Sequence, residues 1–548
     1  MGEDLAPYPS FDLYIIKHAE YICGLPRKAE CDDMRNILEY LEETCRRVPD
    51  RDAFICEGDR ISFSELRRRA FEYGMKLAER AGGVRNRPIC VIGEREIDAL
   101  VCMLGCVYSG NYYVLVDASL PDGRIEAMLE SVDFLGAVSC SGKAYHVPGL
   151  VFSDVYGAGT EEGGSEETGT CRHYSSAETE EIIGGIIENS CSFDPLYGVF
   201  TSGTTGVPKL VVKSHASMIS FIEDFTEMFG IDENEVLGNQ FPFYFDASTK
   251  DLYCCLKCGL TVHIIPKQFF SFPQLLLNYL IENRITTIIW VPSALSLVAN
   301  GDGLETIGVP QTVSKVFFVG EQMPVRQLNY WKRHMPDTRF INIYGSTEVA
   351  GNFLYYIYED MLPDDQRLPT GRPFPNTKVF LLSEDGQLIT ESGREGEICV
   401  VGDTLSLGYY GNREMTDKVF VQNPLVGYRE TMYRTGDMAS YDENGNIVWA
   451  SRKDFQIKHM GYRIELSEIE ITLGAVHGIE ECCCSYDPDK KKILFYYTAA
   501  SDMKKEIGKQ VRAKLPKYMF PSKYIRLDSM PHNANGKIDR KKLAQPGQ

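Results

Sequence analysis

The residues best suited to chemistry follow an apolar segment at 197–200. Small or hydroxyl residues come next, and a proline and a lysine close the stretch: Thr201, Ser202, Gly203, Thr204, Thr205, Gly206, then Pro208 and Lys209. Glycine lets backbone N–H groups come close to an anion, while hydroxyls and a lysine add donors and positive charge. The spacing differs from the Walker pattern G-x-x-x-x-G-K-[ST]. A plain surface turn is the alternative, but the unbroken run after a predicted strand favours a loop that binds a polyphosphate.

The segments around this loop alternate between predicted strands and helices, which indicates a parallel sheet. A strand is predicted near 89–92 and a helix near 98–108, while 285–292 and 315–320 have the near-continuous apolar character of buried parallel strands. Ligands of such sheets bind at the carboxyl ends of the strands. We therefore expect bulky residues there to line a binding site: Trp290, Phe317, Val319 and Ile343. Each of them could equally belong to the core, and for Phe317 the core is the stronger interpretation.

Size and charge limit the classes of function. A chain of 548 residues is too long for one core, so two or more domains are expected. The formal net charge of −20 argues against nucleic acid or an anionic membrane as the main partner. No apolar segment is long enough to span a bilayer, and the first residues lack the features of a signal peptide. We therefore expect a cytoplasmic protein. We also expect a monomer.

The 17 cysteines are expected to be reduced, because nothing indicates secretion. The clusters at 254–258 and 482–484 have no second cysteine or histidine pair at zinc spacing. We predict that both pack in the core and bind no metal.

The loop at 197–209 resembles the phosphate loop of the adenylate-forming superfamily, which includes acyl-CoA synthetases, luciferases and amino-acid adenylation domains. Leu210 departs from the pattern, because many members have glycine there. Other segments resemble further motifs of the superfamily in the same order along the chain: 61–66, 109–117, 239–251, 342–348, 433–437, 452–465 and 533–540. In the first of them, Ser64 is predicted to cap the following helix. The resemblance covers about residues 34–545, and chance does not explain agreement of all the motifs.

The resemblance implies an α/β fold with a large N-terminal domain of stacked α/β sheets, a β-rich subdomain and a small, mobile α/β C-terminal domain. We expect an N-terminal extension at 1–32, the large adenylation domain at 33–453 and a small lid domain at 454–548, with the hinge at Asp454. Residues 157–181 are rich in Gly, Glu, Ser and Thr, and are predicted to form a mobile surface insertion.

By the same resemblance, most of these motifs surround ATP and Mg²⁺. The expected ATP-binding residues are Thr201, Ser202, Gly203, Thr204, Thr205, Gly206, Asn342, Tyr344, Gly345, Ser346, Thr347, Asp437 and Arg452. Asp437 would accept hydrogen bonds from the ribose hydroxyls, and Arg452 would contact the ribose or the phosphates. Glu348 and Thr204 would hold Mg²⁺ against the phosphates. The expected catalytic residues are Lys537, Lys209 and Glu348.

Asp246 indicates which class of acid is activated. In superfamily members that activate amino acids, an aspartate here pairs with the α-ammonium group of the substrate, and acyl-CoA synthetases generally lack it. A buried carboxylate needs a cationic partner of this kind. The local alternative is a cap for the helix at 248–258. Together with the wall residues, the expected substrate site comprises Asp246, Phe245, Trp290, Phe317, Val319, Gly320 and Ile343.

The implied reaction has two steps. A carboxylate attacks the α-phosphate of ATP to give an acyl adenylate and pyrophosphate, and a thiol then displaces AMP to give a thioester. Positioned positive charge in a site without water would reduce the repulsion between the two anions of the first step. For the second step, the C-terminal domain would rotate about Asp454 and withdraw Lys537. The loop around Gly461 would then form the thiolation tunnel for a phosphopantetheine arm.

The segment 454–465 looks most like the hinge of D-alanine–carrier-protein ligases. Val319 and Lys250 depart from that subfamily, which typically has cysteine and an apolar residue there. An adenylation domain of nonribosomal peptide synthesis fits equally well. No carrier motif follows Lys537, so we expect the carrier protein on a separate chain, or removed. An acyl- or aryl-CoA synthetase is the alternative enzyme, and a catalytically silent nucleotide-binding protein is an alternative of another class.

Overall fold

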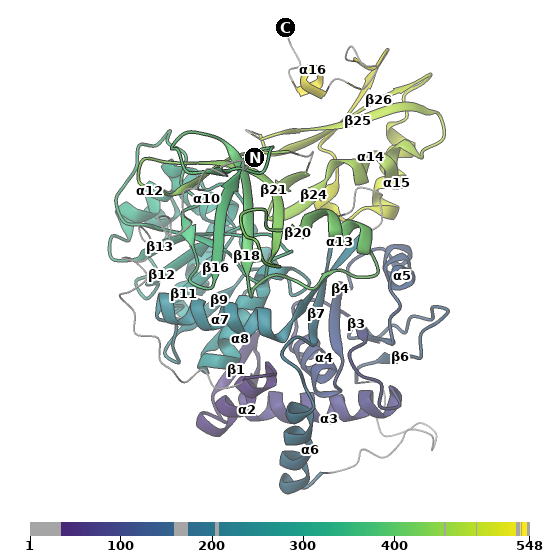
Figure 1. Cartoon of the computed structure of the whole chain (residues 1–548), viewed down its shortest axis with the longest axis vertical. Helices are drawn as coiled ribbons and strands as arrows, with labels where there is room; N and C mark the ends of the chain where they lie inside the picture. The colour runs from purple at the N-terminus through teal and green to yellow at the C-terminus, as the bar shows by residue number, and fades with distance from the viewer. Residues whose placement is uncertain are drawn as a thin grey trace, which may run out of the picture.

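The computed structural model describes residues 34–157, 174–202, 208–453, 456–488, 490–532, 538 and 540–544 (Figure 1). The predicted extension at 1–32 and much of the predicted insertion at 157–181 therefore lie outside the described residues. Within those residues, no helix is both long enough and apolar enough to cross a membrane.

A seven-stranded sheet of the described chain carries the predicted phosphate loop. Its order is β19-β8-β7-β4-β3-β5-β6. In chain order its strands are β3 Pro88–Gly93, β4 Tyr112–Asp117, β5 Gly136–Ser139, β6 Phe152–Val155, β7 Pro195–Thr201, β8 Lys209–Ser214 and β19 Gly408–Tyr409. Strands β3 to β7 run parallel, whereas β8 and β19 are antiparallel to their neighbours. All of β3 is apolar and buried, as expected for a strand that is covered on both faces.

A nine-stranded sheet lies beside it in the described chain, in the order β15-β14-β13-β12-β11-β9-β10-β1-β2. Its strands are β1 Asp52–Cys56, β2 Asp59–Ser62, β9 Val236–Asn239, β10 Thr261–Ile264, β11 Thr287–Trp290, β12 Lys315–Phe318, β13 Arg339–Tyr344, β14 Leu354–Tyr358 and β15 Arg372–Pro373. The strands from β1 to β13 in this order are parallel, and antiparallel strands form both edges.

Helices pack on and between these two sheets. They are α2 Leu38–Arg47, α3 Phe63–Arg80, α4 Ile97–Tyr108, α5 Asp122–Ser131, α6 Ser176–Glu188, α7 His215–Phe229, α8 Thr249–Cys258, α9 Pro273–Glu282, α10 Pro292–Asn300, α11 Gly303–Thr306 and α12 Val325–His334, with 3-10 turns η1 Asp246–Ser248 and η2 Lys267–Ser271. The hydroxyl of Tyr253 on α8 hydrogen-bonds that of Tyr113 on β4 at 2.8 Å. The rings of Phe229 on α7 and Phe317 on β12 are in contact, with their centres 5.0 Å apart. The pair α7 and α8 therefore joins the two sheets into the expected stack (Figure 1).

A β-rich part and a small C-terminal part follow. The first is a six-stranded sheet of the described chain, with β16 Thr377–Leu382, β17 Leu388–Ile389, β18 Gly396–Gly402, β20 Phe420–Gln422, β21 Thr431–Tyr441 and β22 Ile447–Arg452, plus helix α13 Arg413–Val419. The second comprises β23 Gln456–His459, β24 Tyr462–Glu465, α14 Leu466–Gly474, β25 Ile479–Asp487, β26 Lys492–Ala499, α15 Lys504–Lys514, η3 Lys517–Met519, β27 Lys523–Leu527 and α16 Arg540–Ala544. Figure 1 shows this yellow part against the larger one.

Two local predictions are wrong. Helix α3 is capped by Ser62, whose hydroxyl accepts the Glu65 N–H, and not by Ser64. The predicted insertion at 157–181 is too long, because α6 begins at Ser176. Ser175 caps that helix in a reciprocal capping box with Glu178. The predicted packing role of the cysteines at 254–258 agrees with the structure, where all three are buried in α8.

Candidate active site

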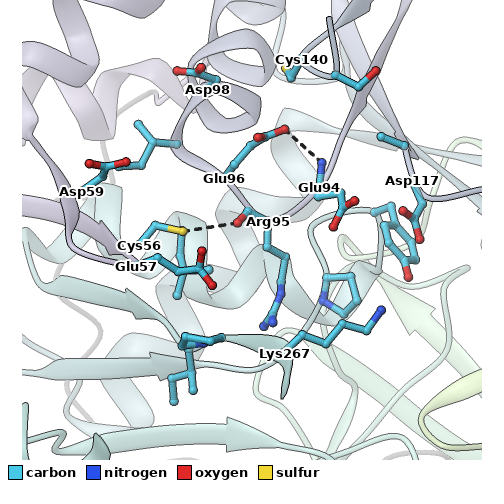
Figure 2. Close-up of a pocket in the computed structure, with 18 of the residues that line it drawn as sticks. Cys56, Glu57, Asp59, Glu94, Arg95, Glu96, Asp98, Asp117, Cys140 and Lys267 are labelled. Atoms are coloured by element: carbon cyan, nitrogen blue, oxygen red, sulfur yellow. Dashed lines mark hydrogen bonds between the residues drawn. The ribbon is translucent and has the colours of Figure 1, made fainter. Parts of the chain in front are cut away.

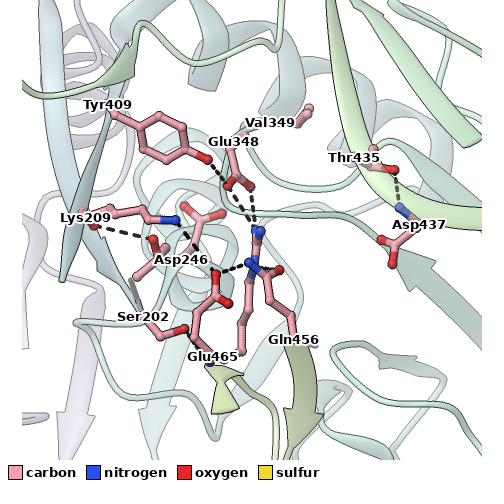
Figure 3. A network of polar contacts seen from close by, with 12 residues as sticks. Ser202, Lys209, Asp246, Glu348, Val349, Tyr409, Thr435, Asp437, Gln456 and Glu465 are labelled. Carbon is pink, nitrogen blue, oxygen red and sulfur yellow. Dashed lines mark hydrogen bonds and ion pairs between the residues drawn. The ribbon is translucent and has the colours of Figure 1, made fainter. Parts of the chain in front are cut away.

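The strands of the phosphate loop contact the C-terminal part of the chain through Ser202. Strands β7 and β8 form an antiparallel pair, and residues 203–207 between them lie outside the described residues. The Ser202 hydroxyl donates to the carbonyl of Arg463 at 3.0 Å and accepts the N–H of Glu465 at 3.0 Å. One hydroxyl of the loop thus binds two backbone groups of β24 (Figure 3).

Lys209 faces the same strand from the other end of the loop. Its ammonium lies 3.8 Å from the Glu465 carboxylate and 5.9 Å from the centre of the Tyr409 ring. The Thr201 hydroxyl donates to the carbonyl of Lys209 at 3.4 Å. The predicted phosphate-binding lysine therefore lies where β8, β19 and β24 meet.

Glu348 is the most completely buried of the predicted catalytic groups that the structure describes, with 1% of its surface exposed. The Arg463 guanidinium contacts its two carboxylate oxygens at 3.0 and 2.8 Å, and the Tyr409 hydroxyl donates to one of them at 2.7 Å. Burial acts to raise the pKa of Glu348, but the charge of Arg463 and the Tyr409 hydrogen bond outweigh it and hold the pKa at about 2. Glu348 is therefore ionised at neutral pH.

The hairpin of β23 and β24, residues 456–465, turns at the predicted tunnel residue. Met460 and Gly461 both have positive φ, +51° and +82°, as a two-residue type I′ turn requires. A Cβ atom on Gly461 would lie 2.7 Å from Cγ1 of Val291, and one on Gly320 would lie 3.5 Å from Cα of Gly461. The turn fits closely between Val291 and Gly320. Glycine is therefore needed at position 461 for two reasons: a Cβ would be too close to Val291, and φ is positive.

Aromatic residues hold the hairpin on both sides. Tyr462 stacks on Tyr518 with ring centres 3.8 Å apart, and makes an edge-to-face contact with Phe245, with ring centres 5.5 Å apart. Its hydroxyl is 3.2 Å from that of Tyr244. Phe245, predicted in the substrate site, also stacks on Phe241. In this arrangement Phe245 is a contact of the hairpin.

Asp437 lies at the other end of the site. Arg452 and the Trp449 indole donate to one of its oxygens at 2.8 and 3.1 Å, and the Tyr344 hydroxyl donates to the other. The structure thus brings together three predicted nucleotide residues from β13, β21 and β22. Lys458 of the hairpin lies over the Tyr344 ring, 4.5 Å from its centre, and burial lowers the pKa of this lysine to about 8.

Asp246 does not cap a helix with its side chain. Its carboxylate accepts a hydrogen bond from Tyr197 at 2.8 Å and pairs with the Lys213 ammonium at 3.1 and 3.3 Å. Lys213 is fully buried and also donates to the carbonyl of Val349. This lysine is not among the predicted site residues. The signal was a charged residue in the apolar strand β8, on the face that Val211 shares.

The predicted wall residues do not form one surface. All four are buried, but the strand register pairs Trp290 with Phe318, and Phe317 with Ile289. Trp290 and Phe317 therefore lie on opposite faces of the sheet. Phe317 packs against α7 in the core, on the same face as Ile343, whereas the Trp290 indole donates to the carbonyl of Gly238.

The other predicted nucleotide-binding residues near Glu348 contact backbone groups or lie in a turn. Asn342 donates to the carbonyl of Pro369 at 2.8 Å, and a Cβ on Gly345 would lie 2.9 Å from the carbonyl of Gly351. Ser346 and Thr347 follow in the turn that leads to Glu348. Six predicted residues lie outside the described part of the chain: Gly203, Thr204, Thr205, Gly206, Asp454 and Lys537.

A polar cavity of about 750 Å³, with Tyr244 in its wall, opens at the carboxyl ends of strands from both large sheets (Figure 2). Cys56, Glu94 and Asp117 mark the ends of β1, β3 and β4 there. Both acidic and basic side chains line it, and Arg95 reaches from its wall to the carbonyl of Gln240 at 2.7 Å. The balance of charge favours no single kind of ligand.

Comparisons with known proteins identify the family of the chain. The family model described as AMP-binding enzyme matches residues 41–410, and the model described as AMP-binding enzyme C-terminal domain matches residues 468–537. The D-alanine–D-alanyl carrier protein ligase of Bacillus licheniformis is 31% identical over 522 residues, which cover 93% of this chain and 99% of that protein. Tyrocidine synthase 1 of Brevibacillus parabrevis is 30% identical over 521 residues, which cover 93% of this chain but only 45% of that synthase.

Solved structures show the same fold. IdnL1 superposes with a TM-score of 0.74 at 25% identity, covering 92% of this chain and 100% of IdnL1. Holo-PA1221, described as a nonribosomal peptide synthetase protein with adenylation and PCP domains, has a TM-score of 0.75 at 24% identity, covering 93% and 84%. These matches confirm the predicted fold class.

The match to the first family model extends over more than half of the chain, and the relatives align along nearly all of it. The predicted superfamily is thereby confirmed: the chain belongs to the AMP-binding enzyme family of adenylate-forming enzymes.

Proposed function

We propose that the protein uses ATP to activate an amino acid as an aminoacyl adenylate, and passes the aminoacyl group to the phosphopantetheine thiol of a carrier protein. The similarity to a carrier protein ligase along its whole length, and to peptide synthetases, supports this activity. The main structural support for the proposal is that the 456–465 hairpin lies between Ser202 and Glu348 and contacts both.

In the first step, an oxygen of the amino-acid carboxylate attacks the α-phosphorus of ATP and pyrophosphate leaves. We assign the phosphates to the loop 201–206 and Lys209, and the ribose to Asp437 with Arg452 beside it. Lys537 would bring a further positive charge to the reacting oxygens. These groups would offset the repulsion between carboxylate and triphosphate.

Glu348 is suited to Mg²⁺, because it is an ionised carboxylate and Mg²⁺ usually takes one or two carboxylates together with substrate phosphates. Among the described residues, no group of three His, Cys, Asp or Glu side chains could hold a metal by itself. Thr204 is the second protein group that we assign to the ion. A bound Mg²⁺ would neutralise charge on the phosphates. Glu348 becomes available for this role only when Arg463 moves away.

In the second step, the carrier thiol attacks the acyl carbon, the bond from that carbon to the AMP oxygen breaks, and AMP leaves with that oxygen. We assign the conformation of this structure to the transfer step, since the hairpin lies next to Glu348 and Gly461 lies against Gly320. Return to the first step would need rotation of the small domain, with the boundary after residue 453 and the hinge at Asp454. The monomeric state and the cytoplasmic location stay predictions.

Loading of a carrier protein tests the proposal. The enzyme, ATP, Mg²⁺ and an amino acid are incubated with a phosphopantetheine-bearing carrier, or with CoA, and the products are measured by mass spectrometry. We expect the carrier to gain the mass of the aminoacyl group and CoA to stay unmodified. Acylation of CoA alone would contradict the proposal and support an acyl-CoA synthetase.

A further inference from the structure

Arg124 of α5 joins the large part of the chain to the small C-terminal part, outside the hairpin at 456–465. Its guanidinium pairs with the carboxylate of Glu468 at 2.7 Å and donates to the carbonyl of Lys514 at 2.9 Å. Glu468 belongs to α14 and Lys514 to α15, so both partners are in the small part (Figure 1). The side chain of Arg124 is 13% exposed and that of Glu468 is 0% exposed. The ion pair is therefore buried at the boundary between the two parts.

The positions of these groups in their helices favour contact across the boundary. Arg124 is in the first turn of α5, where the partial positive charge of the helix N-terminus disfavours a cation. Glu468 is in the first turn of α14, where the same partial charge favours a carboxylate. Lys514 is the last residue of α15, and its carbonyl has the partial negative charge of a helix C-terminus. The arginine is thus unfavourable for its own helix and favourable for the two helices that it contacts, which indicates a role between the two parts.

Both partners of Arg124 are connected to the hairpin. Helix α14 begins at Leu466, directly after β24 ends, so Glu468 lies three residues after the end of the hairpin. Lys514 lies four residues before Tyr518, whose ring stacks on that of Tyr462 in β24 with centres 3.8 Å apart. The domain rotation proposed above would therefore separate Arg124 from both partners when it withdraws the hairpin. The contacts of Arg124 belong to the arrangement that we assign to aminoacyl transfer.

We propose that Arg124 is a positioning residue for aminoacyl transfer: its buried pair with Glu468 keeps the small domain, and with it the hairpin, in the transfer arrangement. The proposal rests on the function proposed above. Removing one partner of a buried ion pair is strongly unfavourable, because the other charge is left without compensation. Loss of either partner therefore destabilises the transfer arrangement. The arrangement for adenylate formation, in which the two charges are apart, keeps its stability.

Separate measurement of the two steps tests the proposal, with the amino acid that gives the fastest pyrophosphate–ATP exchange and a phosphopantetheine-bearing carrier protein. Arg124→Met and Glu468→Gln remove one charge from each part of the chain. We expect both to slow single-turnover transfer by about tenfold or more, and to change exchange by less than about twofold. Arg124→Lys keeps the charge and should restore part of the transfer rate. The matched control is Arg87→Met, because Arg87 pairs with Asp133 within the large part, and it should change neither step.

The double variant of Arg124→Met and Glu468→Gln shows whether the two residues act as a pair. It should transfer no more slowly than the slower single variant, since each change already breaks the same contact. Multiplication of the two single effects would overturn the proposal, as would normal transfer in Arg124→Met or an equal loss of exchange and transfer. Thermal unfolding shows which variants fold, and either single variant decides if the other does not. If the unmodified enzyme loads no carrier, the proposed function itself fails, whereas normal transfer in both single variants contradicts only the role of Arg124.

Discussion

The Arg463 guanidinium contacts both carboxylate oxygens of Glu348, at 3.0 and 2.8 Å, across 115 residues of sequence. Glu348 is the residue that we assign to Mg²⁺, and Arg463 belongs to the hairpin at 456–465. In our account the hairpin brings its own positive charge to the carboxylate when metal and phosphates have left. By this proposal Arg463 and Mg²⁺ would alternate on one carboxylate, and the position of the small domain would be coupled to the step of the reaction.

Replacing Arg463 should slow aminoacyl transfer much more than adenylate formation. In Arg463→Met, docking of the hairpin leaves Glu348 buried without its charged partner, which costs about 3–5 kcal/mol. We expect aminoacyl transfer to the carrier to slow by about a hundredfold or more, while adenylate formation changes much less. Single-turnover transfer and pyrophosphate exchange measure the two steps. Equal loss in both would contradict the alternation, and Arg463→Lys should restore part of the transfer rate.

A second prediction concerns Gly461 in the turn of the hairpin. Gly461→Ala adds a Cβ 2.7 Å from Val291, besides the strain of a positive φ. Gly445→Ala is the matched control, because Gly445 also has positive φ, +76°, but has no atom within 4 Å of an added Cβ. We expect Gly461→Ala to slow transfer by about tenfold, equivalent to about 1.4 kcal/mol of overpacking. If both variants slow transfer alike, close packing of the turn is not the cause.

Substitutions of Lys213 and Asp246 should have non-additive effects on the free energy of unfolding. Lys213→Met leaves Asp246 without its cation and should lower the free energy of unfolding by about 3–5 kcal/mol. The double variant with Asp246→Asn has lost both charges of this pair, so it should be more stable than Lys213→Met alone. Urea denaturation measures both. Simple additivity of the two single changes would show that the pair does not interact.

Stability should also depend on His215. Its Nδ1 accepts the N–H of Ile37 at 3.0 Å in the core, and burial lowers the pKa of His215 from 6.5 to about 4. The unfolded chain therefore binds the proton first as the pH falls. Stability is fully present above pH 6.5, and between pH 6.5 and 4 it should decline by about 3 kcal/mol through this residue. His215→Gln should flatten the profile in that window. An identical pH dependence in variant and parent would contradict the assignment.

Much of the fold could be predicted from sequence because its signals are local. The apolar segments at 285–292 and 315–320 contain β11 and β12, and the order of motifs indicated the stacked α/β architecture. The cap of α3 also has a local signal in the sequence. Ser62 and Glu65 have the S-x-x-E spacing of a capping box, and only Ser62 is placed to accept the Glu65 N–H.

The site was harder to predict because its contacts join distant segments. The sequence indicated that Asp246 needs a cation, but not that Lys213, on another strand, already lies beside it. Likewise, Trp290 and Phe317 have similar positions in their own segments. Only the register of β11 against β12 shows that they face opposite ways. Pairing across a sheet and between domains depends on the whole fold, which single motifs do not contain.

Transfer of an isotope label tests the central claim most directly. The amino acid is labelled with ¹⁸O in its carboxylate, and AMP is analysed by mass spectrometry after reaction with ATP and the carrier protein. If the carboxylate attacks the α-phosphate, each AMP carries one oxygen from the amino acid. AMP without label would mean that water, and not the acid, attacks ATP. Label in inorganic phosphate together with formation of ADP would mean activation at the γ-phosphate. Either result would contradict the adenylate account.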